Sequence, residues 1–364
     1  MGLLRNVGKK LYSFFPVWMK KYLKKVRFND SVKVYKGMSW GDYYYQAIRD
    51  FRPEADEKEK EILRKDMRKA YLEDGTRPDE YLLYRYDRIN QKEKDEYLPR
   101  YLKDLILIDY YKKKNINPQD ILALLRDKFA FYESLKDFFK RDVIKISTKE
   151  DFLIYKDFCN KHHRFIAKEI NGGCGVGVQI FSVEDEEHNR TVFNDLIAKG
   201  EWVIEDVIKQ NQEISSFNSS SINTIRFPSF RHGTKVISAY PCMRFGRTGS
   251  IVDNAGQGGL FVSVDLQTGK ITTDGYDEHG NVFECHPDSG VKFKGFQIPQ
   301  WKELLLEARD AHLALPEEQT YVAFDFALSD KGWVIVEGNW GDFILQQVSM
   351  EKGFKTEFLK LLEE

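Results

Sequence analysis

The sequence predicts a protein of the α/β (α+β) class, in which a helical N-terminal region precedes strands that alternate with helices. Residues 40–115 are rich in charge and tyrosine, and apolar residues recur there at helical spacing, as in residues 54–71. From residue 118 onward, short apolar runs alternate with amphipathic segments, and residues 321–339 form two apolar runs around a turn. We therefore expect a helical part followed by a larger part built on sheets.

The predicted organisation has three parts: a basic segment over residues 1–26, a helical region over 27–117 and an α+β region over 118–364. The last divides into subdomains 118–208 and 209–364. We expect three or four helices in the charged region. Beyond it, helices are expected at 121–139, 152–160, 191–199 and 298–314, and strands at 143–147, 164–169, 202–207, 224–230, 235–245 and 260–264.

Composition excludes several classes of protein. The chain of 364 residues is 42% hydrophobic, which is enough for a sizeable core, and its net charge of −1 gives no overall attraction to nucleic acid. The four cysteines are scattered without the spacing of a zinc site or disulfide framework, which indicates a reducing compartment. No apolar run approaches the ~20 residues of a membrane-spanning helix, and no secretory signal is present. We expect a cytoplasmic protein.

Residues 1–26 carry lysine and arginine but no acidic residue, interleaved with apolar residues that include Trp18. A segment of this kind can lie on an anionic bilayer, with its aromatic residues in the interface. A basic surface helix packed on the protein is the alternative. Peripheral association with the inner face of the membrane and packing on the protein both stay open.

The last two apolar runs contain polar residues where a core would exclude them. Asp325 interrupts the first run, and Glu337 and Asn339 end the second after a turn that includes Gly332. Strand alternation places Glu337 and Asn339 on one face, and an opposed Asp325 would join them. Hard cations such as Mg²⁺ prefer such oxygen ligands. The pattern predicts a metal site, with a satisfied polar strand end as the alternative.

A glycine-rich turn lies between two predicted strands in residues 165–181. Lys168 precedes this turn, whose glycines are Gly172, Gly173, Gly175 and Gly177. Such a turn lets backbone N–H groups approach phosphate oxygens. It is neither a Walker A loop, since no Gly-Lys-Ser/Thr closes it, nor a Rossmann fingerprint, since a strand follows it. A glycine hairpin without a ligand is equally compatible with this segment.

A further apolar strand ends in acidic residues and then continues apolar, through Glu205, Asp206, Val207 and Ile208. Such a segment can hold an adenine ring, with its backbone reading the edge of the base. Glu205 or a neighbour could accept a hydrogen bond from a ribose hydroxyl. Taken alone, this is a strand with a polar end.

In this order, the motifs resemble those of the ATP-grasp superfamily, whose fold consists of two α+β subdomains that hold ATP between them. Lys128 and Lys168 match its two phosphate-contacting lysines, and residues 205–208 match its adenine hinge. Arg226 and Arg244, followed by Asn254 and the Gly258-Gly259 pair, resemble the pattern of ligases that add amino acids to carboxylates. The resemblance assigns catalytic roles to Arg226, Arg244 and Asn254, nucleotide contacts to the glycines, and Mg²⁺ to Asp325, Glu337 and Asn339.

Within the superfamily, the chain resembles the sugar-transfer-associated ATP-grasp family. The residues that carry this resemblance are the blocks at 221–226, 250–259, 297–301, 324–327 and 336–339. The resemblance implies an ATP- and Mg²⁺-dependent ligase that activates a carboxylate of a sugar or glycan as an acyl phosphate and joins it to an amine, in the synthesis of a surface polysaccharide. A kinase acting on a sugar hydroxyl, or an ATP-binding scaffold for glycosyltransferases, would carry the same motifs.

Overall fold

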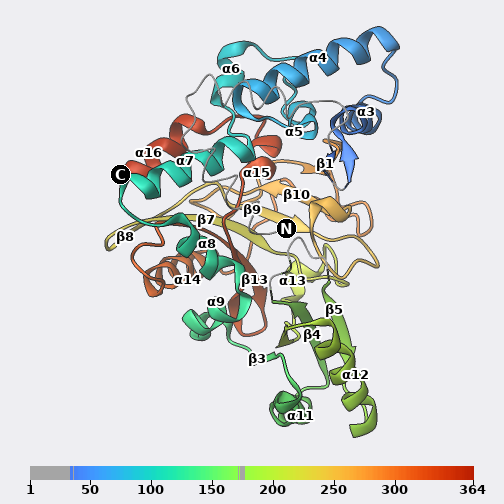
Figure 1. Cartoon of the computed structure of the whole chain (residues 1–364), viewed down its shortest axis with the longest axis vertical. Coiled ribbons are helices and arrows are strands. Elements are labelled where there is room, and N and C mark those ends of the chain that lie inside the picture. Colours follow the sequence, from blue (N-terminus) through green and yellow to red (C-terminus); the bar gives the residue numbers. More distant parts are fainter. Residues whose placement is uncertain (1–32, 36, 171, 173–176) are drawn as a thin grey trace. The chain divides into compact units, whose positions relative to one another are not determined.

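The computed structural model describes residues 33–35, 37–170, 172 and 177–364 (Figure 1). The described residues divide into two compact units, one that ends at Ile106 and one that begins at Leu107. The basic segment predicted over residues 1–26 lies outside the described residues. None of the described helices combines the length and the apolar character needed to cross a membrane.

The first unit is helical, as predicted. After the short strands β1 (Lys33–Tyr35) and β2 (Met38–Ser39), its described part contains α3 (Trp40–Phe51), α4 (Glu57–Asp74), α5 (Pro78–Leu83), α6 (Gln91–Glu96) and the start of α7 (Arg100–Lys113), one or two helices more than expected. Ser39 and Asp56 cap α3 and α4 by accepting hydrogen bonds from backbone N–H groups of the first turn. Gly75 ends α4 in the left-handed region, with φ of 85°.

Most of the described tyrosines in the helical part of this unit belong to its core, although Tyr45 and Tyr101 are exposed. Five of them are almost completely buried, namely Tyr43, Tyr44, Tyr81, Tyr84 and Tyr86. Tyr84 packs on Tyr97 with ring centroids 4.7 Å apart, and Tyr81 lies edge-on to Tyr86 at 5.6 Å. Buried rings of this kind contribute to packing and are not available to stack on a sugar.

After the end of α7, the second unit continues with three short helices, where the sequence predicted one helix over residues 121–139. They are α8 (Pro118–Arg126), α9 (Lys128–Ser134) and α10 (Lys136–Phe139). The break before α9 arises because the Asp127 side chain accepts hydrogen bonds from the N–H groups of Phe129 and Ala130, which starts a new helix. Leu135, with φ of −136°, separates α9 from α10.

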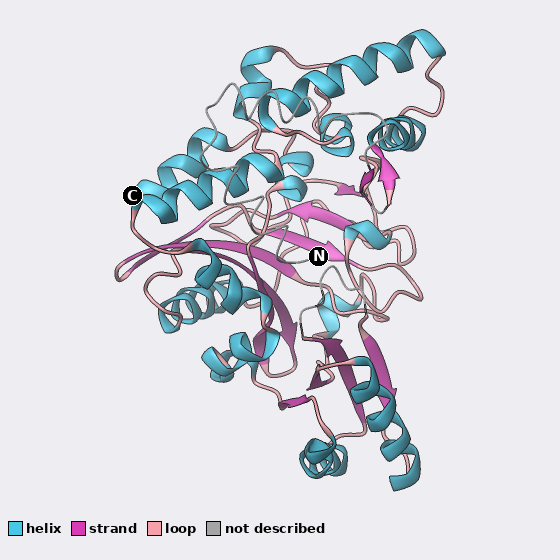
Figure 2. Cartoon of the chain, viewed as in Figure 1, coloured by secondary structure: helices cyan, strands magenta, loops and turns pink. Residues whose placement is uncertain are grey.

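The smaller sheet of this unit has the strand order β3-β6-β4-β5, and its neighbouring strands are antiparallel. The strands are β3 (Val143–Ile146), β4 (Arg164–Glu169), β5 (Gln179–Ser182) and β6 (Trp202–Asp206). The helices α11 (Phe152–Lys161) and α12 (Glu186–Lys199) accompany it (Figures 1 and 2). Tyr155 and Phe193 from the helices share one core with Phe165 and Trp202 from the strands.

Eight of the described strands form the larger sheet, in the order β12-β11-β10-β9-β7-β13-β14, with β8 also paired to β7. These are β7 (Ile225–His232), β8 (Lys235–Ser238), β9 (Cys242–Phe245), β10 (Leu260–Ser263), β11 (Gly275–Tyr276), β12 (Val282–Phe283), β13 (Tyr321–Ser329) and β14 (Gly332–Asn339). The remaining elements of the unit are α13 (Gln212–Ser215), α14 (Trp301–Ala314), α15 (Ile344–Ser349), α16 (Lys355–Glu363) and the single turns Lys149–Asp151 and Ala255–Gln257.

The strand predicted over 235–245 is divided into β8 and β9, which pair with different parts of β7. Pro228 lies in β7 between the residues that pair with β9 and those that pair with β8, a position that tolerates a residue without an N–H. Tyr240, with φ of 49°, turns the chain between the two strands.

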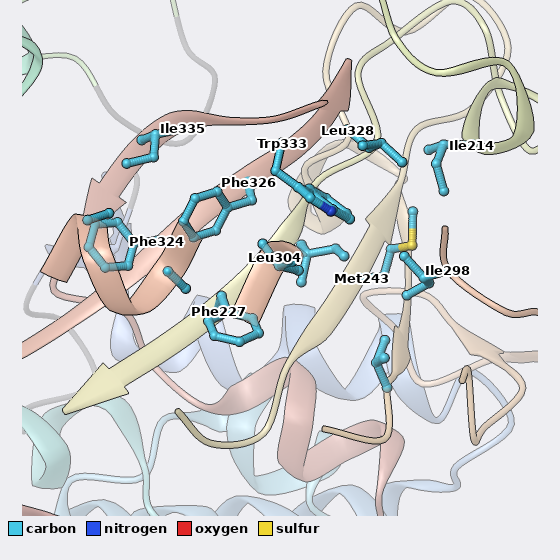
Figure 3. Packing of buried hydrophobic residues seen from close by; sticks show 14 of the residues in the cluster. Ile214, Phe227, Met243, Ile298, Leu304, Phe324, Phe326, Leu328, Trp333 and Ile335 are labelled. Carbon is cyan, nitrogen blue, oxygen red and sulfur yellow. The ribbon is translucent and has the colours of Figure 1, made fainter. Parts of the chain in front are cut away.

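The core of the larger sheet is formed by aromatic and aliphatic side chains that point toward α14. Figure 3 shows Phe324, Phe326 and Trp333 of the β13–β14 hairpin beside Phe227 of β7, with Leu304 of α14 among them. Burial of this apolar surface, at about 25 cal/mol per Å², stabilises the unit. The hairpin whose apolar residues fill the core also carries the polar residues of the candidate site.

Candidate functional site

Asp325, Glu337 and Asn339 meet at the ladder between β13 and β14. Asp325 is paired with Glu337 across the ladder, and the Asn339 side chain reaches both residues. Its Nδ2 atom lies 3.2 Å from Asp325 Oδ2 and 3.1 Å from Glu337 Oε1. The structure therefore brings together the three residues that the sequence predicted as a metal site.

Two arginines approach the same carboxylate from the other side of β13. Arg226, on β7, donates from Nε to Asp325 Oδ1 at 2.5 Å and from one terminal nitrogen to Oδ2 at 3.1 Å. Arg244, on β9, donates to Asp325 Oδ2 at 3.0 Å. Asp325 is fully buried, so these hydrogen bonds satisfy a charge that water does not reach.

The two carboxyl groups have opposite pKa shifts. Burial by itself would raise the pKa of Asp325, but Arg226 and Arg244 outweigh it and hold the pKa at about 2. Burial and the neighbouring Asp325 carboxylate raise the pKa of Glu337 above its ordinary value. Of the two carboxylates, that of Glu337 is therefore the one whose negative charge is less well compensated by its neighbours.

The donor set fits a hard divalent cation. Among the described residues no three His, Cys, Asp or Glu side chains form a metal-binding group, and this site offers two carboxylates and one amide. A half-turn of the Asn339 amide exchanges its nitrogen for its oxygen, which makes the side chain a ligand at the same position. A cation would reduce the repulsion between Asp325 and Glu337. Without a cation, the two arginines and the Asn339 amide are the groups that offset this repulsion.

The loop between β9 and β10 carries Asn254, Gly258 and Gly259. The Asn254 side chain accepts a hydrogen bond from the N–H of Gly256 at 2.9 Å and so shapes its own turn. Gly258 has a φ of 85°, and a Cβ on Gly259 would lie 2.5 Å from the carbonyl oxygen of Asp253. The turn therefore requires both glycines. The catalytic role of Asn254 stays a prediction.

The predicted hinge of the smaller sheet contains a buried ion cluster. Glu205 Oε1 lies 2.8 Å from Lys168 Nζ, and Glu205 Oε2 lies 2.7 Å from a terminal nitrogen of Arg141. Burial alone would raise the pKa of Glu205, but these two cations hold it at about 2. Asp206 instead faces His162, and Val207 and Ile208 are partly exposed. A ribose contact through Glu205 stays a prediction.

Lys128 is the first residue of α9 and points to the start of the glycine turn. Its Nζ donates to the carbonyl oxygens of Glu169, at 3.1 Å, and of Gly172. Desolvation lowers its pKa. Gly177 has a φ of 79°, whereas Gly173 and Gly175 lie outside the described residues. Phosphate contacts by these residues stay predictions.

Sequence reasoning did not find Arg141, which joins the two sheets. Besides binding Glu205, its guanidinium donates to the carbonyl oxygen of Ile335 on β14 at 2.6 Å. A usable signal was present: an acid within an apolar strand needs a cation. Glu205 is paired with Val143, and Arg141 comes two residues earlier.

The model of the family described as sugar-transfer associated ATP-grasp matches residues 108–361. The chain belongs to this family. Its sheets and the helices that flank them form the ATP-grasp fold, preceded by the helical N-terminal region. The matched residues include every position of the candidate site, from Lys128 to Asn339.

Similar solved structures are ligases of low sequence identity. The D-alanine-D-alanine ligase from Coxiella burnetii has 12% identity and a TM-score of 0.38, over 65% of this chain and 55% of that chain. D-alanyl-alanine synthetase A from Vibrio cholerae has 12% identity and a TM-score of 0.42, over 67% of this chain and 66% of that chain. The VanG D-Ala:D-Ser ligase from Enterococcus faecalis has 12% identity and a TM-score of 0.42, over 67% of this chain and 62% of that chain. The chain thus spans less than two thirds of the length of each enzyme. A search of curated protein sequences finds no significant match.

Proposed function

We propose that this protein is an ATP- and Mg²⁺-dependent ligase that activates a carboxylate as an acyl phosphate and joins it to an amine. The observation that carries the proposal is the convergence of Asp325, Glu337 and Asn339 with Arg226 and Arg244. Membership of the ATP-grasp family supports ATP as the nucleotide.

The cation would be held by Asp325, Glu337 and Asn339. When bound there, Mg²⁺ supplies neutralisation of the charge on the phosphate oxygens during transfer. The chain itself adds Arg226, which is partly buried, and Arg244, which is buried; both lie in strands, and hydrogen bonds to Asp325 hold their guanidinium groups in place. Preorganised positive charge of this kind stabilises a transition state without reorganisation.

On the nucleotide side, Lys128 and Lys168 are the proposed phosphate contacts. Both amines now have internal partners, the glycine-turn carbonyls for Lys128 and Glu205 for Lys168. Because Glu205 is committed to cations, we assign recognition of the adenine edge to the backbone of residues 206–208. A backbone donor and acceptor can read that edge without a free side chain.

The proposed reaction has two steps. A carboxylate oxygen of the acceptor attacks the γ-phosphorus of ATP, the bond to the β-phosphate oxygen breaks, and ADP leaves with the electron pair. The amine then attacks the acyl carbon, inorganic phosphate leaves, and the amine loses a proton to solvent. The turn at Asn254, Gly258 and Gly259 would cover the acyl phosphate and exclude water, which would otherwise hydrolyse it.

The name of the family, which associates it with sugar transfer, supports a sugar-linked substrate. We propose a carboxylate-bearing sugar or glycan as the acid, in the synthesis of a surface polysaccharide. The proposed location is the cytoplasm, with residues 1–26 at the inner face of the membrane. Sedimentation with vesicles that contain anionic lipid, compared between the full chain and a chain lacking residues 1–26, tests that location.

The deciding experiment supplies the protein with ATP, Mg²⁺, a panel of uronic acids and hydroxylamine, and measures ADP and hydroxamate. Hydroxamate formed together with ADP in the presence of one acid supports the ligase. ADP with a phosphorylated product and no hydroxamate would overturn it in favour of a sugar kinase. Nucleotide binding without turnover, unchanged in Glu337→Gln, would overturn it in favour of a scaffold.

A further inference from the structure

We propose that Asp253 is a positioning residue that sets the affinity of the candidate site for its divalent cation by sharing the charge of Arg244. The inference rests on the proposed function, since it assumes that Asp325 and Glu337 bind a cation. It assigns a role to a buried acid that contacts neither of those carboxylates.

Asp253 lies in the loop between β9 and β10, and its carboxylate points into the protein. Its Oδ2 accepts hydrogen bonds from the N–H and the hydroxyl of Thr224, at 2.8 Å and 2.5 Å. Its Oδ1 lies 3.5 Å from a terminal nitrogen of Arg244. Because both oxygens face internal donors and the residue is only 7% exposed, Asp253 is not placed to contact a substrate.

Arg244 is divided between two acids. Its terminal nitrogen lies 3.0 Å from Asp325 and 3.5 Å from Asp253. The Thr224 hydroxyl lies between them, since it accepts from that nitrogen at 2.6 Å and donates to Asp253. Arg244, Thr224, Asp253 and Asp325 are all buried, so salt and water screen these interactions little.

This division controls how much negative charge the cation meets. When Asp253 is present, its carboxylate offsets part of the positive charge of Arg244. The negative charge of Asp325 is then less compensated by Arg244 and attracts a cation more strongly. Without the Asp253 carboxylate, Arg244 has Asp325 as its remaining anionic hydrogen-bond partner. A carboxylate more strongly paired with an arginine binds a cation more weakly, because the two positive groups compete for the same oxygens.

The chain offers a matched control in Asp288, which lies after β12 and binds the start of the same loop. Asp288 accepts from Arg247 at 2.7 Å and 2.8 Å and from the N–H of Thr248, and so it also anchors this loop. Replacing Asp288 by Asn removes one negative charge and one loop anchor, as replacing Asp253 does, but it leaves Arg244 untouched.

The test measures Mn²⁺ binding in the presence of ATP by electron paramagnetic resonance, in the full-length wild-type protein, Asp253→Asn and Asp288→Asn. We expect the dissociation constant for Mn²⁺ to rise about tenfold in Asp253→Asn, within the roughly 10–100-fold range typical of groups that support metal ligands. Asp288→Asn should bind Mn²⁺ as the wild type does. Equal affinities in Asp253→Asn and wild type, or an equal loss in both variants, would overturn the inference.

A double-mutant cycle tests the route through Arg244. If Asp253 acts by sharing that charge, then Asp253→Asn should change Mn²⁺ affinity far less in an Arg244→Gln background than in wild type. An undiminished effect there would overturn the inference. Circular dichroism and urea unfolding identify the variants that are folded, and only these are compared. Thr224→Val removes the bridging hydroxyl and should weaken Mn²⁺ binding, as Asp253→Asn does.

The two proposals fail differently. Absence of Mn²⁺ binding by the wild-type protein would remove the basis of both. Mn²⁺ binding that is insensitive to Asp253→Asn, with hydroxamate still formed, would remove only the role of Asp253.

Discussion

Asp325 and Glu337 lie directly opposite each other on β13 and β14, where the ladder register shifts at the next residue pair. Like charges in such a cross-strand position destabilise a sheet. Arg226 and Arg244 stabilise Asp325, whereas the pKa of Glu337 is raised. A conflict of this kind within a well-packed hairpin is typical of functional sites, where local stability is sacrificed for binding.

The first prediction concerns this pair. Glu337→Gln should stabilise the protein in EDTA by about 1 kcal/mol, because it removes a partly buried charge that faces Asp325. The same variant should lose the increase in melting temperature that Mg²⁺ and ATP give the wild-type protein. Thermal unfolding with and without Mg²⁺·ATP measures both effects, and a variant that is less stable in EDTA yet still responds to Mg²⁺ would contradict the assignment.

The second prediction concerns Arg141. Arg141→Met should destabilise the second unit by roughly 3–5 kcal/mol, because it removes a partner of the buried Glu205 and leaves the Ile335 carbonyl without its donor. Urea unfolding measures the change. Lys113→Met is the control, since it breaks an exposed ion pair with Asp109 and should leave the unfolding midpoint unchanged. A similar midpoint in both variants would show that Arg141 is dispensable.

The third prediction concerns Gly338, which separates Glu337 from Asn339. A Cβ there would overlap the ring of Phe131 on α9. Gly338→Ala should therefore cost about 1–3 kcal/mol through overpacking and weaken Mn²⁺ binding by displacing its neighbours. Phe131→Leu in the same chain should recover part of the lost stability. Gly338 is not among the glycines with positive φ, so the cost measured in Gly338→Ala is that of the overlap with Phe131.

The fourth prediction is a pH dependence of stability. His312 is fully buried, with Nδ1 2.7 Å from the Ser229 hydroxyl and Nε2 2.7 Å from the Gln319 carbonyl oxygen. Desolvation lowers its pKa from 6.5 to about 4. Between these values the unfolded chain binds more protons than the folded one, so stability is full above pH 6.5 and falls as the pH decreases toward 4.

At pH 5 this linkage amounts to roughly 2 kcal/mol relative to pH 7.5. Urea unfolding at both values measures it in wild type and in His312→Gln, where the loss on acidification should be smaller by about that amount. His188→Gln, at an exposed histidine, should retain the pH dependence of the wild type. An equal loss in His312→Gln and wild type would contradict the assignment.

Local patterns determined much of the fold. The alternation of residues 321–339 predicted the hairpin of β13 and β14, and residues 164–169 were predicted with the bounds that β4 has. The prediction of one continuous helix over 121–139 was wrong. The apolar periodicity continues through Asp127, but the side chain of that residue caps a new helix. Whether a side chain caps a helix depends on its rotamer, and the pattern of apolar residues gives no information about that rotamer.

The sequence by itself determined the family motifs and the face shared by Glu337 and Asn339, because strand alternation depends only on neighbouring residues. Only the tertiary structure decided which charges meet. Arg226 and Asp325 are 99 positions apart, and Arg141 and Ile335 are 194 apart. Such pairs depend on strand order and register in sheets assembled from distant segments, and packing of the whole core fixes that register.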